Sequence, residues 1–160
     1  MKKVIQVFID VADGINIIIA AIASVLFIPL VGLGVYEVIT RRIFGSPTIW
    51  TLEMTRFVFV PIVILTIGYT LLVGGHATID LFSEKFKART RAIVNTITII
   101  LFLLPSSIVM FINSYRATAM SWASLERTPS AFNAPIYPVK TMMPIGFAVL
   151  ILAAVSWLLK

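Results

Sequence analysis

The chain has 160 residues, of which 59% are hydrophobic and only 12% charged, a balance far more apolar than that of soluble globular domains. Its formal charge of +6 comes from small groups of Lys and Arg between apolar runs. This distribution argues against nucleic-acid binding and is typical of residues that flank membrane spans and attract anionic lipid. The chain contains no cysteine, which excludes disulfides, thiolate metal sites and cysteine nucleophiles.

Apolar runs long enough to cross a bilayer, which takes about 20 helical residues, recur along the sequence. We therefore predict an all-α, polytopic integral membrane protein with four transmembrane helices in a single membrane domain, residues 1–160. The spans are expected at about 15–39, 50–73, 92–115 and 139–159. Short amphipathic segments lying in the membrane interface are expected at about 3–14, 79–90 and 117–137, the last of them only partly helical.

Proline and glycine mark the places where these helices are expected to bend or end. Pro29 should kink the first span, and Gly45-Ser46-Pro47 supplies the turn before the second. The pair Gly74-Gly75 should stop the second span. Pro105 is the corresponding kink position in the third.

The positive charges predict an orientation in the membrane. With an even number of spans both termini face the same side. The densest basic cluster, at residues 85–91, lies between the second and third spans. Because Lys and Arg concentrate in cytoplasmic loops, the termini and this loop are predicted to be cytoplasmic.

Glu53 and Arg56 lie one turn apart at the start of the second span and can pair with each other or with charges on a neighbouring helix. One interpretation is a proton or ion relay. The other is an interfacial pair that fixes the helix register or contacts a partner subunit. We favour the second, because the first turn of a span lies near headgroup depth, where a charge is tolerated more easily.

His76, the one histidine in the sequence, follows the double glycine and precedes Asp80. It could be a haem ligand, a metal ligand or a proton carrier. However, one imidazole in a chain without cysteine cannot complete a two-histidine haem site or a typical zinc site. We favour a helix-end imidazole that bonds backbone carbonyls or the Asp80 carboxylate, and predict no cofactor and no metal.

Catalytic motifs are absent from the sequence. It has no nucleophile elbow, no phosphate-cradling glycine loop and no paired-carboxylate motif, so we predict that the protein is not an enzyme. The spans also carry almost no central charge and show no inverted repeat, the features that indicate a transporter's own substrate site. The chain is therefore expected to support a larger assembly.

Several short motifs occur in a characteristic order: W-x-x-E-x-x-R at 50–56, a glycine at 68, G-H-x-x-x-D at 75–80 and P-I-G-F at 144–147. In this order and within a four-span layout they resemble the small membrane subunit, the DctQ type, of tripartite ATP-independent periplasmic (TRAP) transporters. The resemblance makes the following residues candidates for structural or partner contacts: Trp50, Glu53, Arg56, Gly68, Gly75, His76, Asp80, Pro144 and Gly146.

The resemblance implies a multi-pass protein of the bacterial inner membrane with cytoplasmic termini. Its expected partners are the large TRAP membrane subunit (M type), a periplasmic solute-binding protein (P type) and membrane lipids. In such an assembly the large subunit moves sodium and an organic acid by an elevator mechanism, while the small subunit acts as scaffold and membrane anchor. From the residues alone, two alternatives remain: a membrane anchor of a respiratory or redox complex, and a small self-contained channel or carrier.

Overall fold

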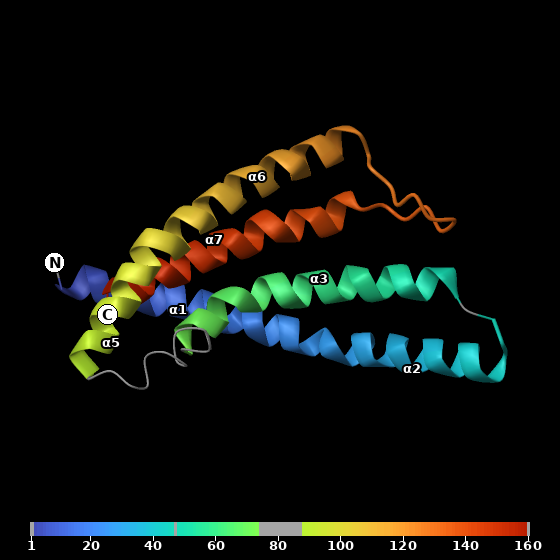
Figure 1. The fold of residues 1–160 in the computed structure, drawn as a ribbon, viewed down its shortest axis with the longest axis horizontal. Coiled ribbons are helices and arrows are strands. Elements are labelled where there is room, and N and C mark those ends of the chain that lie inside the picture. The colour runs from blue at the N-terminus through green and yellow to red at the C-terminus, as the bar shows by residue number, and fades with distance from the viewer. Residues whose placement is uncertain (1, 47, 74–87, 160) are drawn as a thin grey trace.

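The computed structural model describes residues 2–46, 48–73 and 88–159, most of which are helical (Figure 1). The elements are α1 (Lys2–Val25), α2 (Phe27–Ile43), α3 (Ile49–Leu72), α5 (Ala88–Thr98), the π-helix η1 (Ile99–Leu103), α6 (Leu104–Ala123) and α7 (Tyr137–Leu159). Four stretches are long and apolar enough to cross a membrane: Lys3–Ile43, Ile49–Leu72, Ile93–Ala123 and Tyr137–Leu159. The predicted all-α fold with four transmembrane helices is confirmed.

The helical stretch that contains the first span is longer than the predicted span and is broken once. Residues 3–14, expected as a separate interfacial helix, belong to α1 and continue without a break into the span. The break falls instead at Leu26, whose N–H bonds the carbonyl of Ala23 at 3.1 Å. Pro29 accounts for this position, because it has no N–H to donate to the carbonyl of Val25 four residues earlier.

A π-helical turn precedes Pro105 in the third span. The N–H of Leu104 reaches back to the carbonyl of Ile99, and Pro105, the next residue, has no N–H to donate. α6 then continues past Arg116 to Ala123, beyond the expected end of the span at 115. Nothing in residues 117–123 breaks a helix, and a flanking arginine can extend to the polar region without ending one. The connection to α7 is therefore confined to residues 124–136.

The helices form two hairpins whose turns lie at the same end of the bundle (Figure 1). Residues 44–48 join α2 to α3, residues 124–136 join α6 to α7, and both connections lie at the right of the view. We call this the turn end. The N- and C-terminal ends of the chain both lie at the opposite end of the bundle, as an even number of spans requires.

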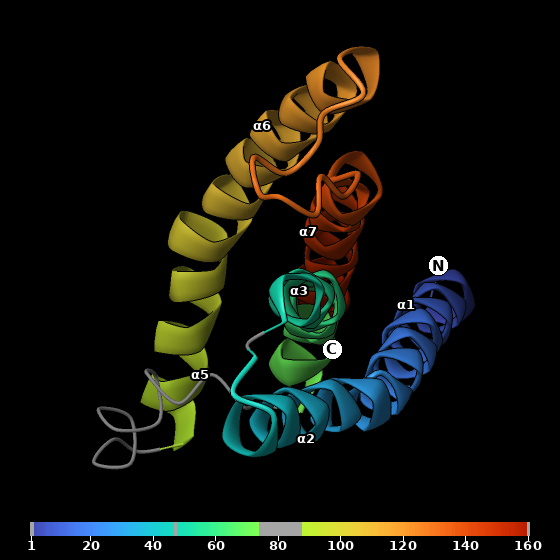
Figure 2. The same cartoon turned by 90° about the vertical axis from the view of Figure 1, so that its right-hand side faces the viewer.

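α3 and α7 lie side by side in the middle of the bundle (Figures 1 and 2). α6 packs on α7, α2 packs on α3, and α1 contacts both central helices. Ala153 and Ala154 of α7 are completely buried, which lets this helix approach its neighbours closely. By contrast, α2 has no buried residue along its length, so its apolar surface is open to lipid or to another protein.

Candidate functional site

The structure describes the candidate residues on α3 and α7. They occupy the first turns of α3, its C-terminal part, and the first half of α7: Trp50, Glu53, Arg56, Gly68, Pro144 and Gly146. The remaining candidates, Gly75, His76 and Asp80, lie outside the described residues. The predicted contact of His76 with Asp80 lies outside them as well.

Gly68 and Gly146 lie where α3 and α7 pack without room for side chains. A Cβ atom on Gly146 would stand 2.1 Å from Cγ2 of Ile64 and 2.7 Å from the Ile64 carbonyl oxygen. A Cβ atom on Gly68 would stand 2.2 Å from Oδ1 of Asn16 and 3.0 Å from Cγ1 of Val149. Both glycines therefore allow close helix contact inside this chain, as small residues do in membrane bundles.

A hydrogen bond joins α1 to α7 at the buried face of the bundle, and a second buried polar side chain lies one turn away on α1. Ser156 of α7 is completely buried and donates a hydrogen bond to Oδ1 of Asp13 at 2.6 Å. Asn16, one turn further along α1, is also completely buried and donates to the carbonyl of Ala12 at 2.9 Å. Asp13, Asn16 and Ser156 are not among the residues predicted from the sequence motifs. Helical periodicity does indicate that Asp13 and Asn16 lie on the buried face of α1, because they share one stripe of the helix with Ala12 and Ala20.

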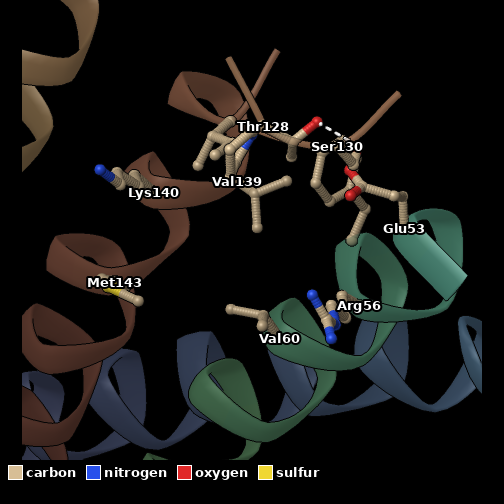
Figure 3. A pocket seen from close by; sticks show the side chains of 11 residues that line it. Glu53, Arg56, Val60, Thr128, Ser130, Val139, Lys140 and Met143 are labelled. Atoms are coloured by element: carbon tan, nitrogen blue, oxygen red, sulfur yellow. Dashed lines mark hydrogen bonds between the residues drawn. The ribbon is translucent and has the colours of Figure 1, made fainter. Parts of the chain in front are cut away.

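Glu53 and Arg56 do not form an ion pair with each other. Glu53 is only 6% exposed, and its Oε2 atom has no hydrogen-bond partner among the described residues. Arg56 is exposed. Both line a cavity of about 470 Å³ between α3, the start of α7 and the α6–α7 connection (Figure 3). Glu53 and Arg56 lie one helical turn apart as expected, but both side chains line this cavity and they do not pair with each other.

Two aromatic pairs lie at the turn end. Tyr36 of α2 packs against Trp50 of α3 with ring centroids 5.4 Å apart. Trp122 of α6 packs against Tyr137 of α7 with ring centroids 4.5 Å apart. Tyr and Trp are enriched where a membrane meets water, so this end of the bundle has the composition of a membrane interface.

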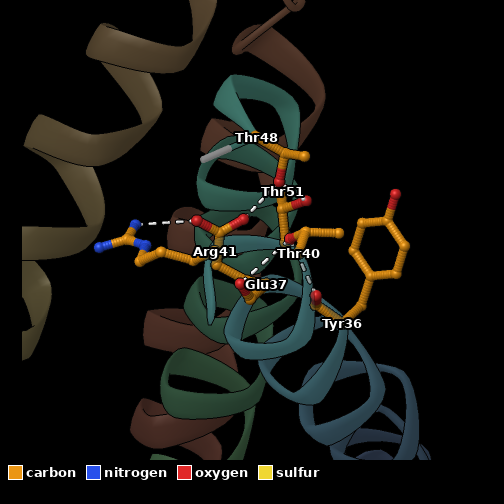
Figure 4. Close-up of polar contacts among 6 residues, drawn as sticks. All are labelled: Tyr36, Glu37, Thr40, Arg41, Thr48 and Thr51. Carbon is orange, nitrogen blue, oxygen red and sulfur yellow. Dashed lines mark hydrogen bonds and ion pairs between the residues drawn. The ribbon is translucent and has the colours of Figure 1, made fainter. Parts of the chain in front are cut away.

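Glu37 of α2 makes a side-chain contact with Thr48, the residue that immediately precedes α3 (Figure 4). Its carboxylate pairs with Arg41 one turn later at 2.8 Å and accepts a hydrogen bond from the hydroxyl of Thr48. The hydroxyls of Thr48 and Thr51 are in turn hydrogen-bonded at 2.5 Å. Glu37 is not among the residues predicted from the sequence motifs, although its i,i+4 spacing to Arg41 favours an ion pair.

An ion pair between Glu126 and Lys140 attaches the α6–α7 connection to the first turn of α7. Lys140 Nζ donates to Glu126 Oε2 at 2.5 Å, and the N–H of Ile136 donates to the carbonyl of Glu126 at 3.0 Å. The hydrogen bond from Lys140 holds the pKa of Glu126 below its ordinary value of 4.5. The carboxylate is therefore ionised over the physiological pH range and keeps its contact with Lys140.

Acidification is expected to remove the stability that this contact contributes. Because the folded-state pKa of Glu126 is lowered, the contribution is full above the unfolded-state pKa and is lost as pH falls through the folded-state value. The difference in melting temperature between the wild type and Glu126→Gln should therefore shrink between about pH 5 and about pH 3. A difference that stays constant over this range would contradict the assignment.

A family model described as "Tripartite ATP-independent periplasmic transporters, DctQ component" matches residues 30–160. The chain belongs to the DctQ family. The match includes all of α3 to α7 and most of α2, and every candidate residue lies within it. DctQ proteins are transporter components and not a family of enzymes, so the assignment favours transport over the redox-anchor alternative. The predicted family resemblance is thus confirmed.

This DctQ chain is also similar to part of a much longer transporter protein. It is 28% identical over 75 residues to the sialic acid TRAP transporter permease protein SiaT of Haemophilus influenzae (strain 86-028NP). The matched residues make up 47% of this chain and 12% of that permease. The chain therefore corresponds to a small part of the relative's length. Together with the four apolar helices, the family identifies a multi-pass membrane protein of a TRAP system.

Proposed function

We propose that the chain is the small permease subunit of a TRAP transporter and acts as scaffold and membrane anchor for a large elevator-type subunit. The large subunit would carry sodium and an organic acid, delivered by a periplasmic solute-binding protein. The family match over residues 30–160 is the observation on which this proposal rests. The similarity to a TRAP permease supports the same system and does not define the substrate of this chain.

The packing of the bundle supports a static role. The centre is filled by small, fully buried side chains, among them Ala23, Ala153 and Ser156, so the helices meet closely. Large apolar side chains instead cover the outside, as on α2 and on the exposed face of α6 with Val109 and Met110. A rigid body with a broad apolar exterior suits a scaffold that is held by lipid and by a membrane partner.

In the proposed orientation the termini are cytoplasmic and the turn end faces the periplasm. The basic cluster at residues 85–91 supports this arrangement, because such clusters remain on the cytoplasmic side. The α6–α7 connection would then be the part of the chain within reach of the solute-binding protein. Trp50 would lie in the periplasmic headgroup region.

Purification and reconstitution test the proposal. The tagged chain should co-purify from its native membrane with a large polytopic subunit, and uptake of an organic acid by the pair should require a sodium gradient and the solute-binding protein. Omitting this chain should abolish or strongly reduce uptake. Equal uptake by the large subunit alone would overturn the scaffold role. Transport by this chain alone would favour a self-contained carrier, and a Soret absorption band would favour a redox anchor.

A further inference from the structure

The cavity at the turn end combines an apolar wall with charged and hydroxyl groups (Figure 3). Val60 of α3 and Met143 of α7 lie on its lower part in this view, below Thr128 and Ser130 of the α6–α7 connection. Its volume of about 470 Å³ falls in the range of small-molecule sites. The cavity can therefore hold a polar group together with part of a hydrocarbon chain.

Glu53 provides the main evidence that the cavity has a ligand. Its side chain is more than nine-tenths buried, yet Oε2 meets no hydrogen-bond donor among the described residues. A buried carboxylate without a partner is strongly unfavourable. Lys140 does not supply the partner, because its amine points away from the cavity and bonds Glu126 (Figure 3). A cationic donor from outside the chain would complete the site.

Arg56 supplies the opposite charge on the same wall. It lies one helical turn from Glu53, and no ion pair joins the two. A guanidinium without a carboxylate partner is well suited to bind a phosphate. The cavity thus presents a buried acceptor for a cation and, close by, a donor for an anion, which is the pattern that a zwitterion complements.

The location of the cavity favours a lipid over a water-soluble zwitterion. Tyr36, Trp50, Trp122 and Tyr137 lie at the same end of the bundle, which places the cavity at the level of lipid headgroups. The apolar wall formed by Val60 and Met143 offers a surface for an acyl chain. A water-soluble zwitterion without an acyl chain would leave the apolar surface of Val60 and Met143 uncovered.

We propose that this cavity binds an aminophospholipid of the phosphatidylethanolamine type. The ammonium group donates to Glu53, the phosphate accepts from Arg56, and the beginning of one acyl chain lies along Val60 and Met143. Phosphatidylcholine cannot donate a hydrogen bond from its quaternary ammonium group, and phosphatidylglycerol has no cation, so both should bind more weakly. This inference concerns lipid recognition and does not depend on the scaffold role.

Lipid retention measures the proposed binding. The full chain is incorporated in nanodiscs with equal amounts of phosphatidylethanolamine, phosphatidylcholine and phosphatidylglycerol, extracted gently and examined by native mass spectrometry. The wild type should retain one phosphatidylethanolamine. Glu53→Gln should reduce the preference for this lipid about tenfold, and Arg56→Gln should weaken retention of all three lipids by about the same factor, as expected for bonds to charged groups.

Control variants separate the cavity from general charge and folding effects. Arg42→Gln removes an exposed cation near the same end that does not line the cavity, and it should leave retention unchanged. Glu53→Gln should not lower the melting temperature in lipid-free detergent, because the Glu53 Oε2 atom has no hydrogen bond among the described residues that the substitution could remove. If it does unfold the chain, Met143→Trp, which fills the apolar part, should still prevent retention.

Three results would overturn the proposal. One is equal retention of phosphatidylethanolamine by the wild type, Glu53→Gln and Arg56→Gln. Another is displacement of the lipid by glycerophosphoethanolamine, which carries the headgroup without acyl chains, at the same concentration as by the intact lipid. The third is the absence of retained phosphatidylethanolamine from the wild type; a photo-crosslink from position 143 to a protein partner would then assign the cavity to a protein side chain.

Discussion

Gly146→Ala should strongly destabilise the bundle by forcing α3 and α7 apart. The new methyl group would stand 2.1 Å from Cγ2 of Ile64, and it would also stand 2.7 Å from the Ile64 carbonyl oxygen. A rotamer change can relieve the first contact but not the second, because the carbonyl belongs to the backbone of α3. Overpacking of this kind costs about 1–3 kcal/mol when the site can adjust. We expect Gly146→Ala to lower the stability of the bundle by at least about 3 kcal/mol. The loss is measured as a lower melting temperature of the purified chain in nanodiscs.

Gly34→Ala is the matched control, because a Cβ atom there meets nothing within 4 Å and the residue lies on exposed α2. It should cause no loss of stability, since alanine favours a helix over glycine by about 1 kcal/mol. Combining Gly146→Ala with Ile64→Ala should restore only part of the stability, because the carbonyl contact remains. Full recovery would show that the side chain, and not the backbone approach, limits the contact. An unchanged melting temperature for Gly146→Ala would contradict the close approach of α3 to α7 at Gly146.

The number of spans followed from the sequence because long apolar runs have few alternatives in a chain of this composition. Pro29 and Pro105 also indicated the two irregular places, since a missing N–H disturbs the turn that precedes the proline. The ends of the helices were less predictable. Arg41 and Arg42 lie inside α2, and Arg116 lies inside α6. A charge next to an apolar run marks the limit of the hydrocarbon region, whereas a helix continues until its backbone is interrupted.

The candidate site was predictable as a set of residues but not as a set of contacts. Gly68 and Gly146 came from short motifs, and their role depends on which helices cross at those positions, information that no local pattern contains. The i,i+3 spacing of Glu53 and Arg56 permitted an ion pair. However, the α6–α7 connection folds over the start of α3 and gives both side chains another environment. Ser156 was missed for the same reason, since its partner Asp13 is distant in the sequence.

Ser156→Ala is expected to weaken the attachment of α1 to α7 by about 1–1.5 kcal/mol. Hydrogen bonds between membrane helices average less than 1 kcal/mol, and hydrogen bonds in folded proteins contribute about 0.5–1.5 kcal/mol. The Ser156 hydroxyl lies 2.6 Å from Oδ1 of Asp13 and is shielded from solvent, so we expect a value above the membrane average. Thermal unfolding of the purified chain measures the difference.

Ser106→Ala provides the control, because Ser106 is exposed and its hydroxyl bonds the carbonyl of Leu103 within the same segment. Its effect should stay within about 0.5 kcal/mol. Asp13→Ala and the double variant with Ser156→Ala complete a cycle that isolates the coupling between the two side chains. A coupling near zero would mean that the small side chains along the crossing, and not this bond, hold α1 in place. A clear coupling would make Asp13 the polar contact that fixes the register of α1 on the buried face of α7.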